Sequence, residues 1–241
     1  DPFSPDNLLI FAAGLLCGTP ATGCNRTIVS TISPQTRLMA FSMMGGFWAP
    51  ELKYAGYDKV ILRGKSSDLV YLWIKDDKIE IRDAAHLQGK GAVETAGLIR
   101  KELKEPKAQV AAIGLAGENR VYYASIEQGR SSASRGGIGA VMGDKGVKAI
   151  AVRGTKDLNI AQPELFMELC NEVARLDESK PQDRALADEA LRAAVLMLCP
   201  IVPHISHHLW QVLGGEGDVM DAPWPAVDES ALERDTIDMV V

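Results

Sequence analysis

A glycine-rich loop in the middle of the chain has the residue types of an anion-binding segment. It contains three serines, one arginine and four glycines, at Ser131, Ser132, Ser134, Arg135, Gly136, Gly137, Gly139 and Gly143. Glycine lets the backbone take positive φ and approach a ligand closely, and free N–H groups can then donate to phosphate oxygens. Two known phosphate motifs do not fit, because Met142 replaces the third glycine of the dinucleotide motif and Asp144 excludes the nucleotide-triphosphate loop. A tight structural turn is the alternative.

Two other segments could place donors near the same anion. Gly45 and Gly46 precede a predicted helix over residues 47–55, and the N-terminus of a helix presents free backbone N–H groups. Arg26 follows a turn-rich loop, and its planar guanidinium could clamp a phosphate. Each has a simpler interpretation, because a glycine pair before a helix is often only a turn and Arg26 could be a solvated charge at the start of a strand.

Charge is distributed unevenly along the 241 residues. Residues 1–160 carry 21 Lys and Arg against 16 Asp and Glu, a net charge of +5, whereas residues 161–241 carry 5 against 16, a net charge of −11. The first part therefore suits an anionic ligand, and the second part would repel one. No apolar run is as long as a membrane span and no signal peptide is recognisable, so we expect a cytoplasmic protein without a membrane partner.

Strands and helices must position these residues. Apolar and β-branched runs predict strands at residues 8–13, 27–32, 60–62, 70–74, 79–81, 108–113, 121–126 and 147–152. Residues 38–44 form a further apolar run, and helical spacing predicts a second helix at 93–103. Because strands and helices do not alternate strictly, the pattern favours an α+β domain with a mixed sheet over a doubly wound sheet.

The composition changes after Gly154. Residues 164–176 and 183–199 are rich in Ala and Leu and predict helices, and Pro203 can start another helix. His204 and His208 lie four apart on that helix, but no glutamate in the arrangement of a zinc protease accompanies them, so ordinary surface and core histidines are favoured. No C-x-x-C pair occurs among the four cysteines, Cys17, Cys24, Cys170 and Cys199. The sequence therefore predicts a helical tail, free thiols and no metal-binding residue.

Spaced motifs in the first 155 residues resemble the N-terminal domain of the tungsten-containing aldehyde ferredoxin oxidoreductases. They occur in the family's order, as Asp1-Pro2-x-Ser4-Pro5, Gly45-Gly46-Phe47, Glu51-Leu52-Lys53-Tyr54-Ala55-Gly56-Tyr57-Asp58, Ala112-Ile113-Gly114-x-Ala116-Gly117-Glu118-Asn119 and Arg135-Gly136-Gly137-x-Gly139-Ala140-Val141-Met142-Gly143. The resemblance favours a ligand-binding role for the glycine loop, in agreement with the positive charge of this region.

In that family the N-terminal domain is an α+β base for a tungsten or molybdenum bis-pterin cofactor, and an Fe4S4 cluster and the substrate channel belong to later helical domains. The resemblance implies that Arg26, Gly45 with Gly46, and the loop from Ser131 to Gly137 contact the pterin phosphates. It also implies that the main-chain carbonyls of Met43 and Ser132 help to hold a bridging magnesium ion. No Fe4S4 cluster is expected in this chain, because the cluster cysteines are missing.

The sequence departs from the family pattern in three ways. Met43 and Met44 stand where the family often has polar residues, although a main-chain contact survives a change of side chain. Serines occupy the small or basic positions of the loop. The family's first strands, which would precede Asp1, are missing, and we expect this to leave sheet edges unpaired.

The tail resembles a different family. Residues 190–241 are similar to the end of the helical anticodon-binding domain of bacterial leucyl-tRNA synthetases. The motifs are Leu191-Arg192-Ala193-x-Val195-Leu196-Met197-Leu198-x-Pro200-Ile201-Val202-Pro203-His204-Ile205 and Asp221-Ala222-Pro223-Trp224-Pro225-x-Val227-Asp228-Glu229. We expect an oxidoreductase-like domain over residues 1–160 and a synthetase-like tail over residues 161–241.

Three functions follow from these resemblances. The first is the cofactor-cradling part of an oxidoreductase that oxidises aldehydes to carboxylic acids with ferredoxin as electron acceptor, inactive by itself. The second is a tRNA-binding fragment of a leucyl-tRNA synthetase, which the net charge of −11 over residues 161–241 makes less favourable, because nucleic-acid affinity comes from Lys and Arg. The third is a non-functional chimera. The tail, without the rest of the synthetase bundle, is expected either to fold on itself as a helical hairpin or to associate between chains.

Overall fold

The computed structural model describes residues 1–175, 180–198 and 203–223. The chain divides into two compact units, Asp1–Asn171 and Glu172–Val241, and each is described by itself. The strands of the first unit are β1 (Leu9–Ala13), β2 (Thr27–Ile32), β3 (Met39–Met44), β4 (Lys59–Leu62), β5 (Val70–Lys75), β6 (Lys78–Asp83), β7 (Gln109–Ala112), β8 (Ile126–Gln128), β9 (Ser131–Ala133) and β10 (Val147–Arg153). Its helices are α1 (Trp48–Tyr54), the short 3-10 helix η1 (Ala85–Leu87), α2 (Ala92–Leu103), α3 (Leu115–Glu118) and α4 (Ile138–Asp144).

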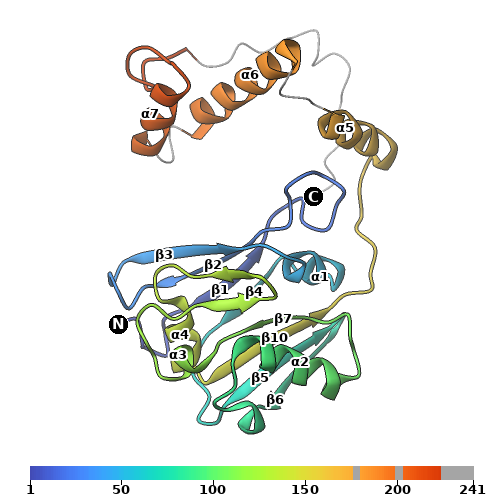
Figure 1. Cartoon of the computed structure of the whole chain (residues 1–241), viewed down its shortest axis with the longest axis vertical. Coiled ribbons are helices and arrows are strands. Elements are labelled where there is room, and N and C mark those ends of the chain that lie inside the picture. The colour runs from blue at the N-terminus through green and yellow to red at the C-terminus, as the bar shows by residue number, and fades with distance from the viewer. Residues whose placement is uncertain (176–179, 199–202, 224–241) are drawn as a thin grey trace. The chain divides into compact units, whose positions relative to one another are not determined.

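Two sheets form the first unit. One has four antiparallel strands in the order β3-β2-β1-β4, and the other has six strands in the order β6-β5-β10-β7-β8-β9. The six-stranded sheet is mixed, because β10 runs parallel to β5 and antiparallel to β7. Helices α1 and α4 pack against strands of both sheets, and α2 covers the other face of the six-stranded sheet (Figure 1). The predicted α+β class is confirmed.

Two apolar cores hold these layers together. The first lies between the sheets, where Phe11 of β1 packs on Trp48 of α1 with ring centroids 5.4 Å apart. The indole Nε1 of Trp48 donates to the carbonyl oxygen of Ile150 at 3.0 Å, which ties α1 to β10. The second core lies under α2, around Ile99 and Val110. Burying whole apolar side chains contributes about 1.5–3 kcal/mol each, so these cores fix the positions of the strand ends.

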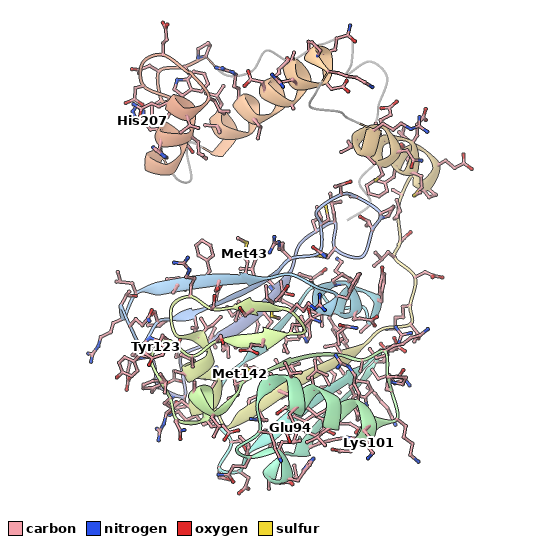
Figure 2. The ribbon with its side chains drawn as sticks, viewed as in Figure 1. Met43, Glu94, Lys101, Tyr123, Met142 and His207 are labelled. Atoms are coloured by element: carbon pink, nitrogen blue, oxygen red, sulfur yellow. The ribbon has the colours of Figure 1, made fainter. Side chains whose placement is uncertain are left out.

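The outer face of the four-stranded sheet is apolar but exposed. Because successive side chains of a strand point to opposite faces, Ser42 and Met44 of β3 point inward, whereas Met39, Phe41 and Met43 point outward. These three outward side chains are 72%, 65% and 50% exposed. Figure 2 shows Met43 on this outer side of β3. The unit thus presents a flat apolar surface next to the end of β3.

Most predicted helices and strands are confirmed, but the strand predicted just before the glycine loop is not. The predicted strand at 121–126 is wrong, because residues 121–125 form turns and β8 begins only at Ile126. The amide of Val121 donates back to the carbonyl of Ala116, and Arg120 has φ of +55. The first part of the glycine loop is a strand, β9, which pairs with β8 as a hairpin.

The second unit is helical where the structure describes it, as predicted. Helix α5 (Pro163–Arg175) crosses the boundary between the units, and α6 (Pro181–Leu198) and α7 (Pro203–Val212) follow. The guanidinium of Arg192 lies 5.9 Å from the ring centre of Trp210 and also bonds the carbonyl of Leu213, so α6 and α7 pack together. Cys199, the side chain of His204 and residues 224–241 lie outside the described part. In that part no helix combines the length and apolar character needed to cross a bilayer.

Candidate functional site

Three segments far apart in the sequence meet at the end of β3. Thr27 pairs with Met44, so Arg26, just before β2, and Gly45, just after β3, leave the sheet at the same end. A Cβ added at Gly45 would lie 3.1 Å from Oγ of Ser131 and 3.6 Å from Nη1 of Arg26. The structure therefore brings together three of the residues that the sequence singled out.

The rest of the loop continues beside β3. The amide of Arg135 donates to Oγ of Ser42 at 3.2 Å, and a Cβ added at Gly136 would lie 2.9 Å from Cβ of Ala40. The loop thus runs antiparallel to β3, with its start near Gly45 and its end near Ala40. Arg26 and Arg135 both lie beside β3. Arg26 approaches Gly45 and the backbone of Arg135 bonds Ser42, and three residues of extended chain span about 10 Å.

Only the first half of the glycine motif is available to a ligand. Gly137 is buried, has φ of +65, and an added Cβ would lie 2.0 Å from the carbonyl oxygen of Tyr122. A Cβ added at Gly139 would lie 2.4 Å from the carbonyl oxygen of Ser125. One added at Gly143 would lie 1.9 Å from the carbonyl oxygen of Gly117. These glycines are required because backbone segments pack closely there. The structural-turn interpretation is therefore correct for this half of the motif.

We call the remainder, in which Gly45 is buried and both arginines are exposed, the anion cradle. It comprises Arg26, Gly45, Gly46, Ser131, Ser132, Ser134, Arg135 and Gly136. The guanidinium groups of Arg26 and Arg135 have no hydrogen bond or ion pair with any described residue, whereas Arg153 pairs with Glu51 at 2.9 Å. The guanidinium of Arg130, directly before the loop, also has no partner among the described residues. Sequence reasoning missed this arginine. Arginine donors left unpaired on one surface suit an anion.

Backbone and hydroxyl donors of the cradle are also unused. The N–H groups of Gly45, Gly46, Ser134 and Gly136 donate to no other described residue, and neither do the cradle's serine hydroxyls. Unpaired backbone donors normally bind water or a ligand. Together with the two arginines, they are donors suited to phosphate oxygens, and the set contains no catalytic acid, base or nucleophile.

Buried polar atoms without partners adjoin the cradle. Oγ1 of Thr27 and Oε1 of Gln128 are enclosed and accept no hydrogen bond in the described part of the chain. Gln128 lies against the turn, since a Cβ added at Gly46 would be 1.7 Å from its Oε1. Buried polar groups are paired in most proteins, and exceptions concentrate at functional sites. Sequence reasoning missed Gln128, because nothing in its local pattern marks it.

Another recess of the first unit has the wrong charge for an anion. A recess of about 650 Å³ between α2 and α3 contains the carboxylates of Glu94 and Glu127. A smaller recess of about 250 Å³ adjoins the cradle between the loop before Arg26 and the start of α1, with Asn25 and Phe47 in its walls. Charge, rather than volume, favours the cradle as the binding site. No group of three or more metal-ligating side chains gathers among the described residues.

Comparison with known proteins shows a family for the first part of the chain. The profile of the aldehyde ferredoxin oxidoreductase N-terminal domain matches residues 1–154. The tungsten-containing aldehyde ferredoxin oxidoreductase of Pyrococcus furiosus is 49% identical over 173 residues, which are 71% of this chain and 29% of that protein. A solved structure, the active site complex BamBC of benzoyl coenzyme A reductase in complex with 1,5-dienoyl-CoA, matches with 81% identity and a TM-score of 0.71. That match covers 72% of this chain and 27% of the other.

The tail matches a second family. The profile of the anticodon-binding domain of tRNA ligases matches residues 162–241. The leucine–tRNA ligase of Hahella chejuensis is 57% identical over 77 residues, which are 32% of this chain and 9% of that protein. The first profile match ends at residue 154 and the second begins at residue 162, so the change of family falls between β10 and α5. Both resemblances seen in the sequence are confirmed.

The chain spans less than a third of the length of the oxidoreductases that it matches. By its first 154 residues, the chain belongs to the aldehyde ferredoxin oxidoreductase family.

Proposed function

We propose that the first unit is the phosphate-holding base for a tungsten or molybdenum bis-pterin cofactor in a larger oxidoreductase. One observation carries this proposal: Arg26 and Arg135, which are exposed and have no partner among the described residues, both lie beside β3, and Arg26 reaches the open space at Gly45. Bidentate arginine contacts and backbone N–H groups are the donors that phosphate oxygens accept best.

The residues present fit such a group. Gly45 leaves open the space that a Cβ would fill between Ser131 and Arg26, so a phosphate oxygen can approach the backbone. Arg26 and Arg135 would hold phosphates, and carbonyl oxygens of Met43 and Ser132 would contribute to a magnesium site. The exposed side chain of Phe41 offers an apolar surface to a planar ring system. The bound group would supply the electron-transfer chemistry, and the protein would orient it and exclude water.

The solved relative favours one reaction class. The chain is 81% identical, over 72% of its length, to a chain of a complex named for benzoyl coenzyme A reductase. It is 49% identical to a named aldehyde oxidoreductase. We therefore propose that the whole enzyme reduces the ring of an aromatic acyl-CoA. We prefer this reaction to the aldehyde oxidation with ferredoxin that the sequence suggested. In either case catalysis would belong to the whole enzyme, and the part described here would position the cofactor.

The tail does not favour an RNA-binding function. Residues 161–241 carry a net charge of −11, and nucleic-acid affinity depends mainly on Lys and Arg that neutralise phosphates. The alternative of a tRNA-binding fragment predicts retention of tRNA that weakens with salt. A chimera of two fragments without function predicts neither anion binding nor tRNA retention.

Anion binding by matched arginine variants tests the proposal. Pyrophosphate is the probe, and its binding to the whole chain is measured by calorimetry at several salt concentrations. Because Arg26 and Arg135 are exposed, Arg26→Ala and Arg135→Ala should each weaken binding by about threefold to tenfold. Arg63 lies beyond β4, at the other edge of the four-stranded sheet, so Arg63→Ala is the matched control and should leave binding unchanged. Equal losses in all three variants would refute a cradle at β3.

A further inference from the structure

The side chain of Arg26 depends on its backbone for its position. Its guanidinium bonds no other described residue, so no side-chain contact holds it in place. The residue is the last one of a loop that starts at Gly14 and runs around the end of the sheet. Where the guanidinium meets an anion is therefore set by the contacts that hold this loop.

Cys17 contacts the backbone of Arg26. Its side chain is buried, with 1% exposure, and its Sγ lies 3.5 Å from the carbonyl oxygen of Arg26. The amide of Cys17 donates to the carbonyl of Gly14 at 3.1 Å, so both ends of the loop are tied through one residue. A thiol that faces a carbonyl oxygen can only donate its proton.

Burial keeps this thiol protonated. Desolvation raises the pKa of Cys17, and hydrogen bonds with the backbone of Gly14 and Arg26 offset the rise only in part. A protonated thiol is a weak hydrogen-bond donor, and an ionised one would repel the carbonyl oxygen. The environment of Cys17 thus favours the form that can hold the backbone of Arg26.

A second contact holds Gly18, the residue that follows Cys17. The hydroxyl of Tyr54, on α1, donates to the carbonyl of Gly18 at 2.6 Å. Gly18 has φ of +85, and a Cβ there would lie 3.0 Å from both Leu158 and Tyr54. The loop next to Cys17 is therefore fixed against α1 and the segment after β10, which leaves the thiol little freedom to move.

We propose that Cys17 is a positioning residue of the anion cradle: its thiol fixes the carbonyl of Arg26 and thereby directs the guanidinium toward Gly45. The inference rests on the proposed function, because it gives Cys17 a role in anion binding that acts through Arg26. A cysteine that merely filled the core would contribute volume and no donor.

Variants that separate volume from donation test this role. Cys17→Ser keeps a donor and Cys17→Val keeps the apolar volume without one. Pyrophosphate binding to the whole chain is measured for both, with Cys170→Val on α5 as a matched thiol control. Cys17→Ser is expected to bind within about twofold of the parent, and Cys17→Val about threefold to tenfold more weakly. If Cys17→Val does not fold, Cys17→Ala serves as the second donor-free variant.

A double-mutant cycle shows whether Cys17 acts through Arg26. In the Arg26→Ala background, Cys17→Val should weaken binding no further, since the group that it positions is gone. Additive losses, or binding by Cys17→Val equal to that of the parent, would overturn this inference alone. If the parent chain itself does not bind pyrophosphate, the cradle is overturned and the inference falls with it.

Discussion

Substituting Gly46 by alanine tests how tightly the turn at the cradle is held. Gly46 has φ of +93, and an added Cβ would lie 1.7 Å from Oε1 and 2.8 Å from Cδ of Gln128. Gln128 is only 5% exposed, and its Nε2 donates to Oε1 of Gln109 at 2.8 Å. The amide of Gln128 must therefore move, and lose this hydrogen bond, before a methyl group fits.

The structure sets the size of the effect. Positive φ costs a non-glycine residue about 1–2 kcal/mol. Loss of the amide hydrogen bond adds about 1 kcal/mol. Gly46→Ala should therefore lower the free energy of unfolding of the first unit by about 2–3 kcal/mol, which corresponds to a Tm lower by roughly 4–12 °C.

The assay is thermal unfolding followed by near-ultraviolet circular dichroism of Trp48 and Trp73, both buried in the first unit. Gly23→Ala is the matched control, because Gly23 has φ of +76 but no atom within 4 Å of an added Cβ. Gly23→Ala should therefore lose only the stability that positive φ costs a non-glycine residue. The double variant with Gly46→Ala and Gln128→Ala has no clash. Its loss of stability should therefore be smaller than the sum of the losses in the two single variants. If Gly46→Ala unfolds at the same temperature as Gly23→Ala, the contact with Gln128 is refuted.

Three further predictions concern other parts of the chain. Lys148→Met should destabilise the first unit by about 3 kcal/mol in urea unfolding, because Lys148 is fully buried and the carboxylate of Glu118 would lose its ion pair. Burial and the hydrogen bond to Glu102 raise the pKa of Tyr71 to about 12, so the stability that its neutral phenol provides is complete below pH 10 and is lost as the pH rises toward 12. The loss should reach about 2 kcal/mol and be absent in Tyr71→Phe. Limited proteolysis should cut first between residues 155 and 185, where the composition changes, and a resistant segment there would contradict a modular chain.

Local pattern was sufficient for most strands and helices, and it failed where distant backbone decided the outcome. Val121, Tyr122 and Tyr123 resemble a strand by composition, yet Tyr122 and Tyr123 are exposed in a turn and only their neighbours reach the sheet. β9 is polar and only three residues long, so neither its length nor its composition marks it as a strand. It forms because β8 pairs with it.

The candidate site shows the same division. Arg26 and Gly45 were identified from residue type and family motif, because glycine turns and arginines are recognisable locally. Their approach to Ser131 depends on the register between β2 and β3 and on the hairpin of β8 and β9, which no local pattern contains. Gln128 was missed for the same reason, since its importance comes from its contact with Gly46.

Helix α5 also bears on the history of the gene. None of its side chains is buried, and the match to the second family begins at residue 162, directly before it. A join at the start of such a helix disrupts no packed core. Selection on stability would tolerate that join in a way that it would not tolerate one inside β10, whose residues from Val147 to Val152 are buried. The start of α5 is therefore a position at which a C-terminal segment can be exchanged without disturbing a packed core.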